Sequence, residues 1–143
     1  MKTIKIAIAF LLSLLLYPGC ENCGCYCSGY DVEELVMNAD SDLNYTSIYC
    51  NPEYEISLSF DSLQDSRCPI GAMCIWEGNA RIKLKIRQSG ESEISFWLNT
   101  HDSFLSDTVV NGIRYELIDV LPYPELDKEY QLDDYLLQMR ISD

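Results

Sequence analysis

The chain has 143 residues, 48% of them apolar and 11% aromatic, which is enough for the core of one domain. Intrinsic disorder is therefore disfavoured. Ten Lys and Arg stand against 23 Asp and Glu, so the formal net charge is −13. Such a charge repels phosphate backbones, which excludes nucleic acid as an expected partner and leaves solubility as the simplest role of the acidic surface.

The first 19 residues have the organisation of a bacterial export signal. Lys2 and Lys5 precede an apolar stretch of eleven residues, 6–16. That stretch is too short to cross a bilayer as a helix, the alternative interpretation, and is typical of a signal peptide. Removing residues 1–19 takes two lysines away, leaving 8 cations against 23 acids, a mature charge of −15.

Residues 16–20, Leu-Tyr-Pro-Gly-Cys, resemble the lipobox of bacterial lipoproteins. Gly19 and Cys20 fit that pattern, whereas Tyr17 and Pro18 depart from it. The resemblance implies that Cys20 becomes the first mature residue and carries a diacylglycerol thioether and an N-acyl chain such as palmitate, a durable membrane anchor. An ordinary signal-peptidase site is the alternative. We expect a lipid-anchored protein of the bacterial cell envelope, in the outer membrane, with its periplasmic or surface face left open.

Seven cysteines are an odd number for an exported chain. Acylation of Cys20 leaves six, which suits three disulfides in an oxidising compartment. The six are Cys23, Cys25, Cys27, Cys50, Cys68 and Cys74. The i,i+2 spacing in the tether, residues 20–30, is poor for a zinc site, so we expect disulfides and no metal. Such neighbours rarely pair with each other, so Cys50 is expected to join one of the first three, with the connectivity left open.

Residues 31–143 are expected to form a single domain that begins with a short helix or a strand over residues 31–37. Residues 38–44, Asn-Ala-Asp-Ser-Asp-Leu-Asn, then place oxygen side chains at alternate positions, as calcium loops do. An EF-hand also needs Gly at its sixth position and Glu at its twelfth, and counting from Asn38 gives Leu43 and Tyr49. We therefore expect a solvated turn there and no bound calcium.

Period-two alternation follows along the rest of the chain and predicts strands. It runs through residues 54–60, and again through residues 81–87, where Ile82, Leu84 and Ile86 alternate with four cations. A three-residue loop after Arg87 would bring cations opposite acids and apolar residues opposite one another. The pairs in that register are Arg87–Glu91, Lys85–Glu93, Leu84–Ile94 and Ile82–Phe96. The basic stripe is therefore expected to face an acidic strand and not a ligand.

The Asn111-Gly112 pair predicts a two-residue hairpin turn between residues 108–110 and 113–120. Pro122 and Pro124 end that strand because they lack backbone donors. A last strand over residues 135–141 has Leu136 on its outer face. Many short strands separated by turns predict an all-β fold, a small antiparallel β-sandwich or barrel-like domain, with an immunoglobulin-like sandwich preferred.

The only histidine, His101, is followed directly by Asp102 and Ser103. Neighbours in sequence do not form a catalytic triad, which needs side chains that converge from separate segments, so we expect a surface loop. Asp and Glu are abundant elsewhere, but abundance without a burying position is no sign of catalysis. We therefore expect no enzyme, no catalytic residue and no cofactor.

Cys68 and Cys74 enclose five residues, and a disulfide between them would contribute about 2.4 kcal/mol in the chain-entropy model. Trp76 lies two residues further on and could cover the bridge. The enclosed residues are a candidate binding loop, which in extended form would fit a protease cleft; a structural staple is the alternative. These residues are Pro69, Ile70, Gly71, Ala72 and Met73.

The run Asp-Ser-Arg-Cys-Pro-Ile-Gly-Ala-Met-Cys-Ile-Trp-Glu-Gly-Asn-Ala, residues 65–80, and the later Pro-Tyr-Pro, residues 122–124, resemble a family of small uncharacterised bacterial lipoproteins. Its signature is D-S-R-C-P-x4-C-x-W-x-G-x-A, and the similarity covers roughly residues 45–143. Glu77 departs from the small residue that members often have. The resemblance implies a lipoprotein with a β fold and no mechanism. The expected function is a structural or protein-interaction module with an unidentified envelope or extracellular partner; the alternative is a protease-inhibitor-like binder.

Overall fold

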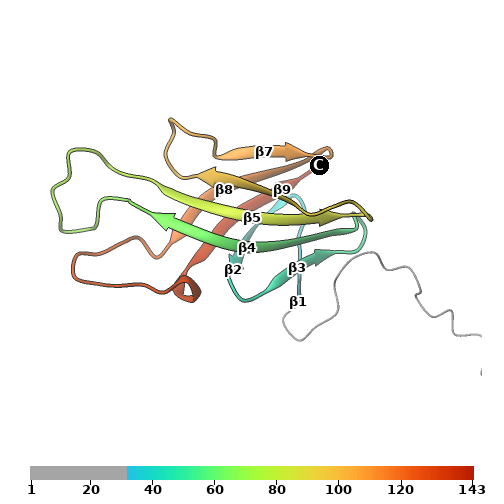
Figure 1. Ribbon diagram of the computed structural model, residues 1–143, viewed down its shortest axis with the longest axis horizontal. Coiled ribbons are helices and arrows are strands. Elements are labelled where there is room, and N and C mark those ends of the chain that lie inside the picture. Colours follow the sequence, from blue (N-terminus) through green and yellow to red (C-terminus); the bar gives the residue numbers. More distant parts are fainter. Residues whose placement is uncertain (1–31) are drawn as a thin grey trace, which may run out of the picture.

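The computed structural model describes residues 32–143 (Figure 1). The expected signal peptide, Cys20 and the cysteine-rich tether lie outside the described residues. No helix within 32–143 is long and apolar enough to cross a membrane. The elements are β1 (Val32–Glu34), β2 (Ala39–Asn44), β3 (Ile48–Asn51), β4 (Ile56–Asp65), β5 (Ala80–Gln88), β6 (Ile94–Asn99), β7 (Asp107–Val110), β8 (Ile113–Leu121), the 3-10 turn η1 (Leu132–Asp134) and β9 (Leu136–Ser142).

The strands form two sheets that face each other. One has the order β1-β3-β4-β5-β6 and the other the order β2-β9-β8-β7. Neighbours in sequence are mostly neighbours in a sheet, paired antiparallel, and β1 alone among the described strands pairs parallel, with β3. The predicted antiparallel sandwich is confirmed. It is the two-layer architecture that immunoglobulin-like domains also have, with a strand order of its own.

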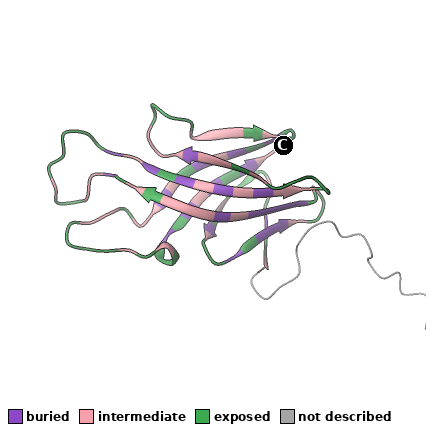
Figure 2. Cartoon of the chain, in the orientation of Figure 1, coloured by how far each residue is buried: buried purple, intermediate pink, exposed green. Residues whose placement is uncertain are grey.

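The core lies between the sheets and is built from the alternating residues that the sequence pattern places on one face of each strand (Figure 2). Ile82, Leu84 and Ile86 are buried in β5, as predicted. Two bulges change the alternation: one at Asp61 in β4 and one at Ile118 in β8. Each bulge inserts one residue, so the inward position moves from even to odd numbers in β4 and from odd to even in β8.

The Asn111-Gly112 hairpin is confirmed. Both residues have positive φ, 50° and 84°, as a two-residue turn that follows the twist of the strands requires. The turn joins β7 to β8, and β8 ends at Leu121, directly before Pro122, as predicted. The last strand, β9, also matches its prediction, with Leu137, Met139 and Ile141 buried and Leu136 exposed.

The predicted register between β5 and β6 is wrong by two residues. Leu84 pairs with Phe96 and Ile86 with Ile94, because the turn extends over residues 89–93 instead of three residues. A shift of two residues leaves the same side chains facing the core, so the burial prediction survives the error. The cations find other acids than predicted: Lys83 and Lys85 both pair with the bulge residue Asp61, and Arg87 lies 3.7 Å from Glu93.

Residues 38–44 are not a solvated turn. Residues 39–44 form β2, an edge strand paired antiparallel with β9. The alternating polar residues that suggested a turn are the outer face of this strand, and Leu43, on the other face, is buried in the core. Residues 32–34 resolve the choice between helix and strand in favour of the strand β1.

Three long connections lie at one end of the sandwich, on the left of Figure 1. They join β4 to β5 (residues 66–79), β6 to β7 (residues 100–106) and β8 to β9 (residues 122–135). We call this group of loops the loop end. The turns between β3 and β4, between β5 and β6 and between β7 and β8 lie at the opposite end, as does the C-terminus.

Candidate functional site: the loop end

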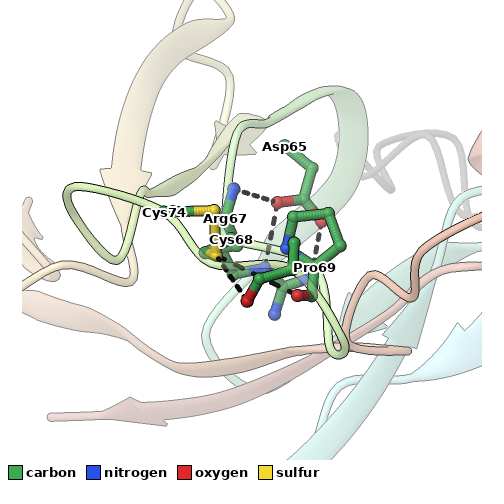
Figure 3. Close-up of a disulfide and its surroundings, with 6 residues drawn as sticks. Asp65, Arg67, Cys68, Pro69 and Cys74 are labelled. Carbon is green, nitrogen blue, oxygen red and sulfur yellow. Dashed lines mark hydrogen bonds and ion pairs between the residues drawn. A yellow bond between two sulfur atoms is a disulfide. The ribbon is translucent and has the colours of Figure 1, made fainter.

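The β4–β5 loop is closed by the disulfide between Cys68 and Cys74, whose Cα atoms are 5.9 Å apart (Figure 3). This pairing confirms the prediction from their spacing. Cys74 is exposed, and the Trp76 ring packs against His101 instead of covering the bridge. Cys50, in β3, is also disulfide-bonded; its expected pairing with Cys23, Cys25 or Cys27 lies outside the described residues.

Arg67 is a buried cation that ties the β4–β5 loop to the other sheet. Its Nη2 lies 2.7 Å from Asp65 Oδ2, and its Nη1 donates to the carbonyl oxygen of Val120 at 2.6 Å. Nη2 also donates to the carbonyl oxygen of Pro122 at 3.0 Å, and the guanidinium lies over the Tyr123 ring at 4.7 Å. The planar fork of donors explains why an arginine is used here, since a lysine could not reach these acceptors together.

Gly78 and Asn79 fix the part of the same loop that leads into β5. Gly78 has φ +81°, and a Cβ there would lie 2.1 Å from the backbone oxygen of Ser66. The Asn79 side chain accepts hydrogen bonds from the backbone N–H groups of Thr100 and His101 at 3.2 and 3.1 Å. These two residues therefore bring the β4–β5 loop close to itself and to the β6–β7 loop.

The candidate binding loop is a tight turn. Ala72 N–H donates to the carbonyl oxygen of Pro69 at 3.0 Å, with Gly71 at φ +92°. Both backbone groups of Ile70 are hydrogen-bonded: its N–H donates to the carbonyl oxygen of Pro124 at 2.9 Å, and its carbonyl oxygen accepts from Leu126 N–H at 3.1 Å. These residues therefore do not have the extended form that a protease cleft would take, and the backbone of Ile70 is already paired with the β8–β9 loop.

Most of the loop end is exposed (Figure 2), and many of its exposed side chains are apolar. Met73 and Ile75 are fully exposed, and Trp76 is 55% exposed. Eight of the fourteen large exposed apolar side chains among residues 32–143 belong to the three loops. They are Ile70, Met73, Ile75, Trp76, Phe104, Leu105, Tyr123 and Leu126. Scattered apolar residues are normal on a protein surface, whereas large contiguous apolar patches are typical of interaction sites.

His101 joins two of these loops. The centroid of its ring lies 5.8 Å from that of Trp76 and 5.7 Å from that of Phe104, and its Nε2 is 3.2 Å from Glu77 Oε1. His101 lies in a loop at the surface, as predicted, but the contacts of its side chain, which is only 18% exposed, were not predicted. Nothing in the local sequence indicates this contact, since Glu77 and Trp76 lie more than twenty positions away.

A cavity of about 220 Å³ opens beside this ring cluster. Three carboxylates line it, those of Glu77, Asp102 and Asp119, together with polar and aromatic groups of the three loops. Arg67 forms part of the wall, but its charge is already compensated by Asp65. Within residues 32–143, no three His, Cys, Asp or Glu side chains are arranged to hold a metal ion.

Local contacts and burial shift the pKa values of three groups in the β8–β9 loop. A hydrogen bond from the Lys128 ammonium, 2.7 Å away, lowers the pKa of Glu125, and the same bond raises the pKa of Lys128. Burial raises the pKa of Tyr135 at the base of the loop. The one cation of this loop is thus occupied by an acid of the same loop.

Comparisons with known protein families, with curated proteins and with solved structures return no match. The resemblance to the lipoprotein family therefore stays a prediction. The structure does give its signature residues local roles: Asp65 and Arg67 form the buried pair, Gly78 permits the close approach to Ser66, and Ala80 is buried where β5 begins.

Proposed function

We propose that the protein is an exported, lipid-anchored protein of the bacterial cell envelope whose β-sandwich presents the loop end to another protein. One observation carries the interaction role: Met73, Ile75 and Trp76 are exposed on a loop that is otherwise rigidly held. A disulfide, the buried pair of Arg67 and the bonds of Ile70 fix this loop, so little ordering entropy opposes binding there.

In-cell photo-crosslinking tests the interaction role. A photoreactive residue is placed at Ile75 and, as a control, at Val109, an apolar residue that is exposed on β7. A discrete crosslinked protein from position 75 and none from position 109 is the expected result. Equal labelling from both positions would contradict a dedicated surface at the loop end.

The anchor is supported by the sequence of residues 1–20 and is tested separately. Mass spectrometry of the mature protein extracted from membranes reports acylation at Cys20 and the disulfide map together. We expect a diacylglycerol thioether at residue 20 and oxidised cysteines in the rest of the chain. A free, unmodified residue 20 in a soluble protein would reject the anchor but not the loop-end interaction.

The protease-inhibitor alternative has less support. An inhibitory segment binds a protease as an extended strand, whereas residues 69–72 form a turn whose Ile70 backbone is paired with the β8–β9 loop. We therefore propose that the Cys68–Cys74 disulfide shapes an interaction surface and does not hold a protease bait.

A further inference from the structure

The charges around the exposed apolar side chains are strongly one-sided. The three loops carry seven carboxylates and two cations. The carboxylates are those of Glu77, Asp102, Glu125, Asp127, Glu129, Asp133 and Asp134. Both cations are occupied, Arg67 by Asp65 and Lys128 by Glu125. A partner that covers this surface therefore meets apolar side chains on loops whose net charge is negative.

The cavity lies inside this surface. Glu77 and Asp102 line its wall, as does His101, whose ring contacts the rings of Trp76 and Phe104. A cavity of about 220 Å³ with carboxylates at its wall has room for one long side chain that ends in a positive charge. The methylene groups of such a side chain would pass along the rings of His101 and Tyr123, which line the cavity.

We propose that the loop end binds a polypeptide segment that is both basic and apolar. Its apolar side chains cover Met73, Ile75 and Trp76, and one lysine or arginine enters the cavity toward Glu77 and Asp102. This inference rests on the proposed interaction function and adds the chemistry of the partner. Charge complementarity selects a basic polypeptide over a lipid surface, because phosphate headgroups would face the seven carboxylates of the loops.

The test uses the complete mature chain, residues 20–143, exported and oxidised, with Cys20→Ser so that it is studied without detergent. The probe is a synthetic peptide of alternating lysine and leucine. Two matched peptides replace lysine by glutamate or leucine by serine, and calorimetry gives the three affinities. We expect the lysine–leucine peptide to bind at least about tenfold more tightly than either matched peptide, a difference of about 1.4 kcal/mol.

Variants locate the binding. Met73→Ser/Ile75→Ser/Trp76→Ser is expected to weaken binding of the lysine–leucine peptide at least about tenfold, since it removes three apolar contacts. Val109→Ser/Ile118→Ser, which changes apolar residues exposed on the sheet, is expected to leave the affinity unchanged. A second pair, Glu77→Gln/Asp102→Asn, should weaken binding and reduce its dependence on salt. Equal binding by wild type and the triple-serine variant would overturn the proposal.

Vesicles of zwitterionic phosphatidylcholine test the competing hypothesis, that the loop end binds a membrane. If they co-sediment with wild type but not with the triple-serine variant, and the peptide does not bind, the loop end is a membrane-inserting surface and the proposal is wrong. If crosslinking at Ile75 succeeds in cells while no basic peptide is preferred, the interaction function stands and the basic chemistry of the partner is rejected.

Discussion

Arg67 holds the two sheets together at the loop end. It lies on the β4–β5 loop, yet its hydrogen bonds reach Val120 and Pro122, more than fifty positions later. Removing this side chain leaves the Asp65 carboxylate buried without its counter-charge and two carbonyl groups without donors. A buried charge that loses its partner is costly, which separates this pair from those on the surface.

We predict that Arg67→Ala lowers the free energy of unfolding by about 3–5 kcal/mol. The control is Arg114→Ala, whose partner Asp107 and whose own side chain are largely exposed; it should cost no more than about 1 kcal/mol. Urea denaturation measures both. Similar losses for the two variants would show that the hydrogen bonds and ion pair of Arg67 do not stabilise the fold more than an exposed ion pair does.

Gly78 and Gly112 illustrate two different reasons why a position requires glycine: a positive φ, and a close approach of backbone atoms. Both have positive φ, +81° and +84°, but only at Gly78 would a Cβ collide with backbone atoms, those of Ser66 and Arg67. We predict that Gly112→Ala costs about 1 kcal/mol for the backbone conformation alone. Gly78→Ala should cost several times more, because the backbone of the loop must move apart. Thermal unfolding of the two variants tests this prediction. Equal shifts in Tm would show that the close approach of the backbone at Gly78 does not add to the loss of stability.

Tyr115 is fully buried against Phe96, and its hydroxyl finds no hydrogen-bond partner among the described residues. Burial raises its pKa to about 12. Above pH 10 the unfolded chain loses this proton first, so the folded state becomes less stable as pH rises from 10 to 12. The loss from this group is about 2 kcal/mol at pH 12, where half of the folded molecules have also lost the proton.

Tyr115→Phe should therefore flatten the fall in stability between pH 10 and 12. At neutral pH it should raise the free energy of unfolding by about 1 kcal/mol, because it removes an unpaired buried hydroxyl. Urea denaturation from pH 7 to pH 11.5 tests both effects. An unchanged alkaline slope would mean that Tyr115 does not titrate on unfolding.

Among the elements, the β4–β5 loop has more supports than its disulfide. Besides the bridge, Ser66 and Cys68 donate backbone hydrogen bonds to Asn79 and Glu77, and Ile70 pairs with the β8–β9 loop. The loop should keep its shape when the bridge is absent. The free energy of unfolding of the domain should nevertheless fall, because a chain without the disulfide has more conformational entropy in the unfolded state.

We predict that Cys68→Ser/Cys74→Ser lowers the free energy of unfolding by about 2 kcal/mol and leaves the fold intact. Urea denaturation gives the change in stability, and crosslinking from position 75 reports whether the interaction surface survives. A loss of the whole β signal in circular dichroism would contradict the view that the other contacts suffice.

The strands themselves were largely predictable, because alternation within one strand is local. Residues 81–87 and 135–141 show it clearly. The β5–β6 register was not predictable, since it depends on how many residues the turn occupies, and a shift of two residues keeps the same face inward. Strand β2 was missed because its buried face shows little in the sequence beyond Leu43.

At the scale of the whole molecule, stability and the candidate function are located in different places. The core lies between the sheets, while the exposed apolar residues lie at the loop end. We predict that Met73→Ser/Ile75→Ser/Trp76→Ser changes the free energy of unfolding by no more than about 1 kcal/mol. Leu84→Ala, in the core, should cost about 2–5 kcal/mol. Similar losses for both variants, measured in urea, would indicate that the loop end serves stability instead of binding.

The amino-acid sequence by itself determined the acidic charge, most strand positions, the Asn111-Gly112 turn and the pairing of Cys68 with Cys74. The charge follows from composition alone, and the other three depend on residues close together in the chain, where spacing and backbone preference decide. Only the tertiary structure decided that Arg67 reaches the end of β8 and that His101 lies against Trp76. Those contacts join loops far apart in sequence, and they form because packing the two sheets face to face brings their connections to one end.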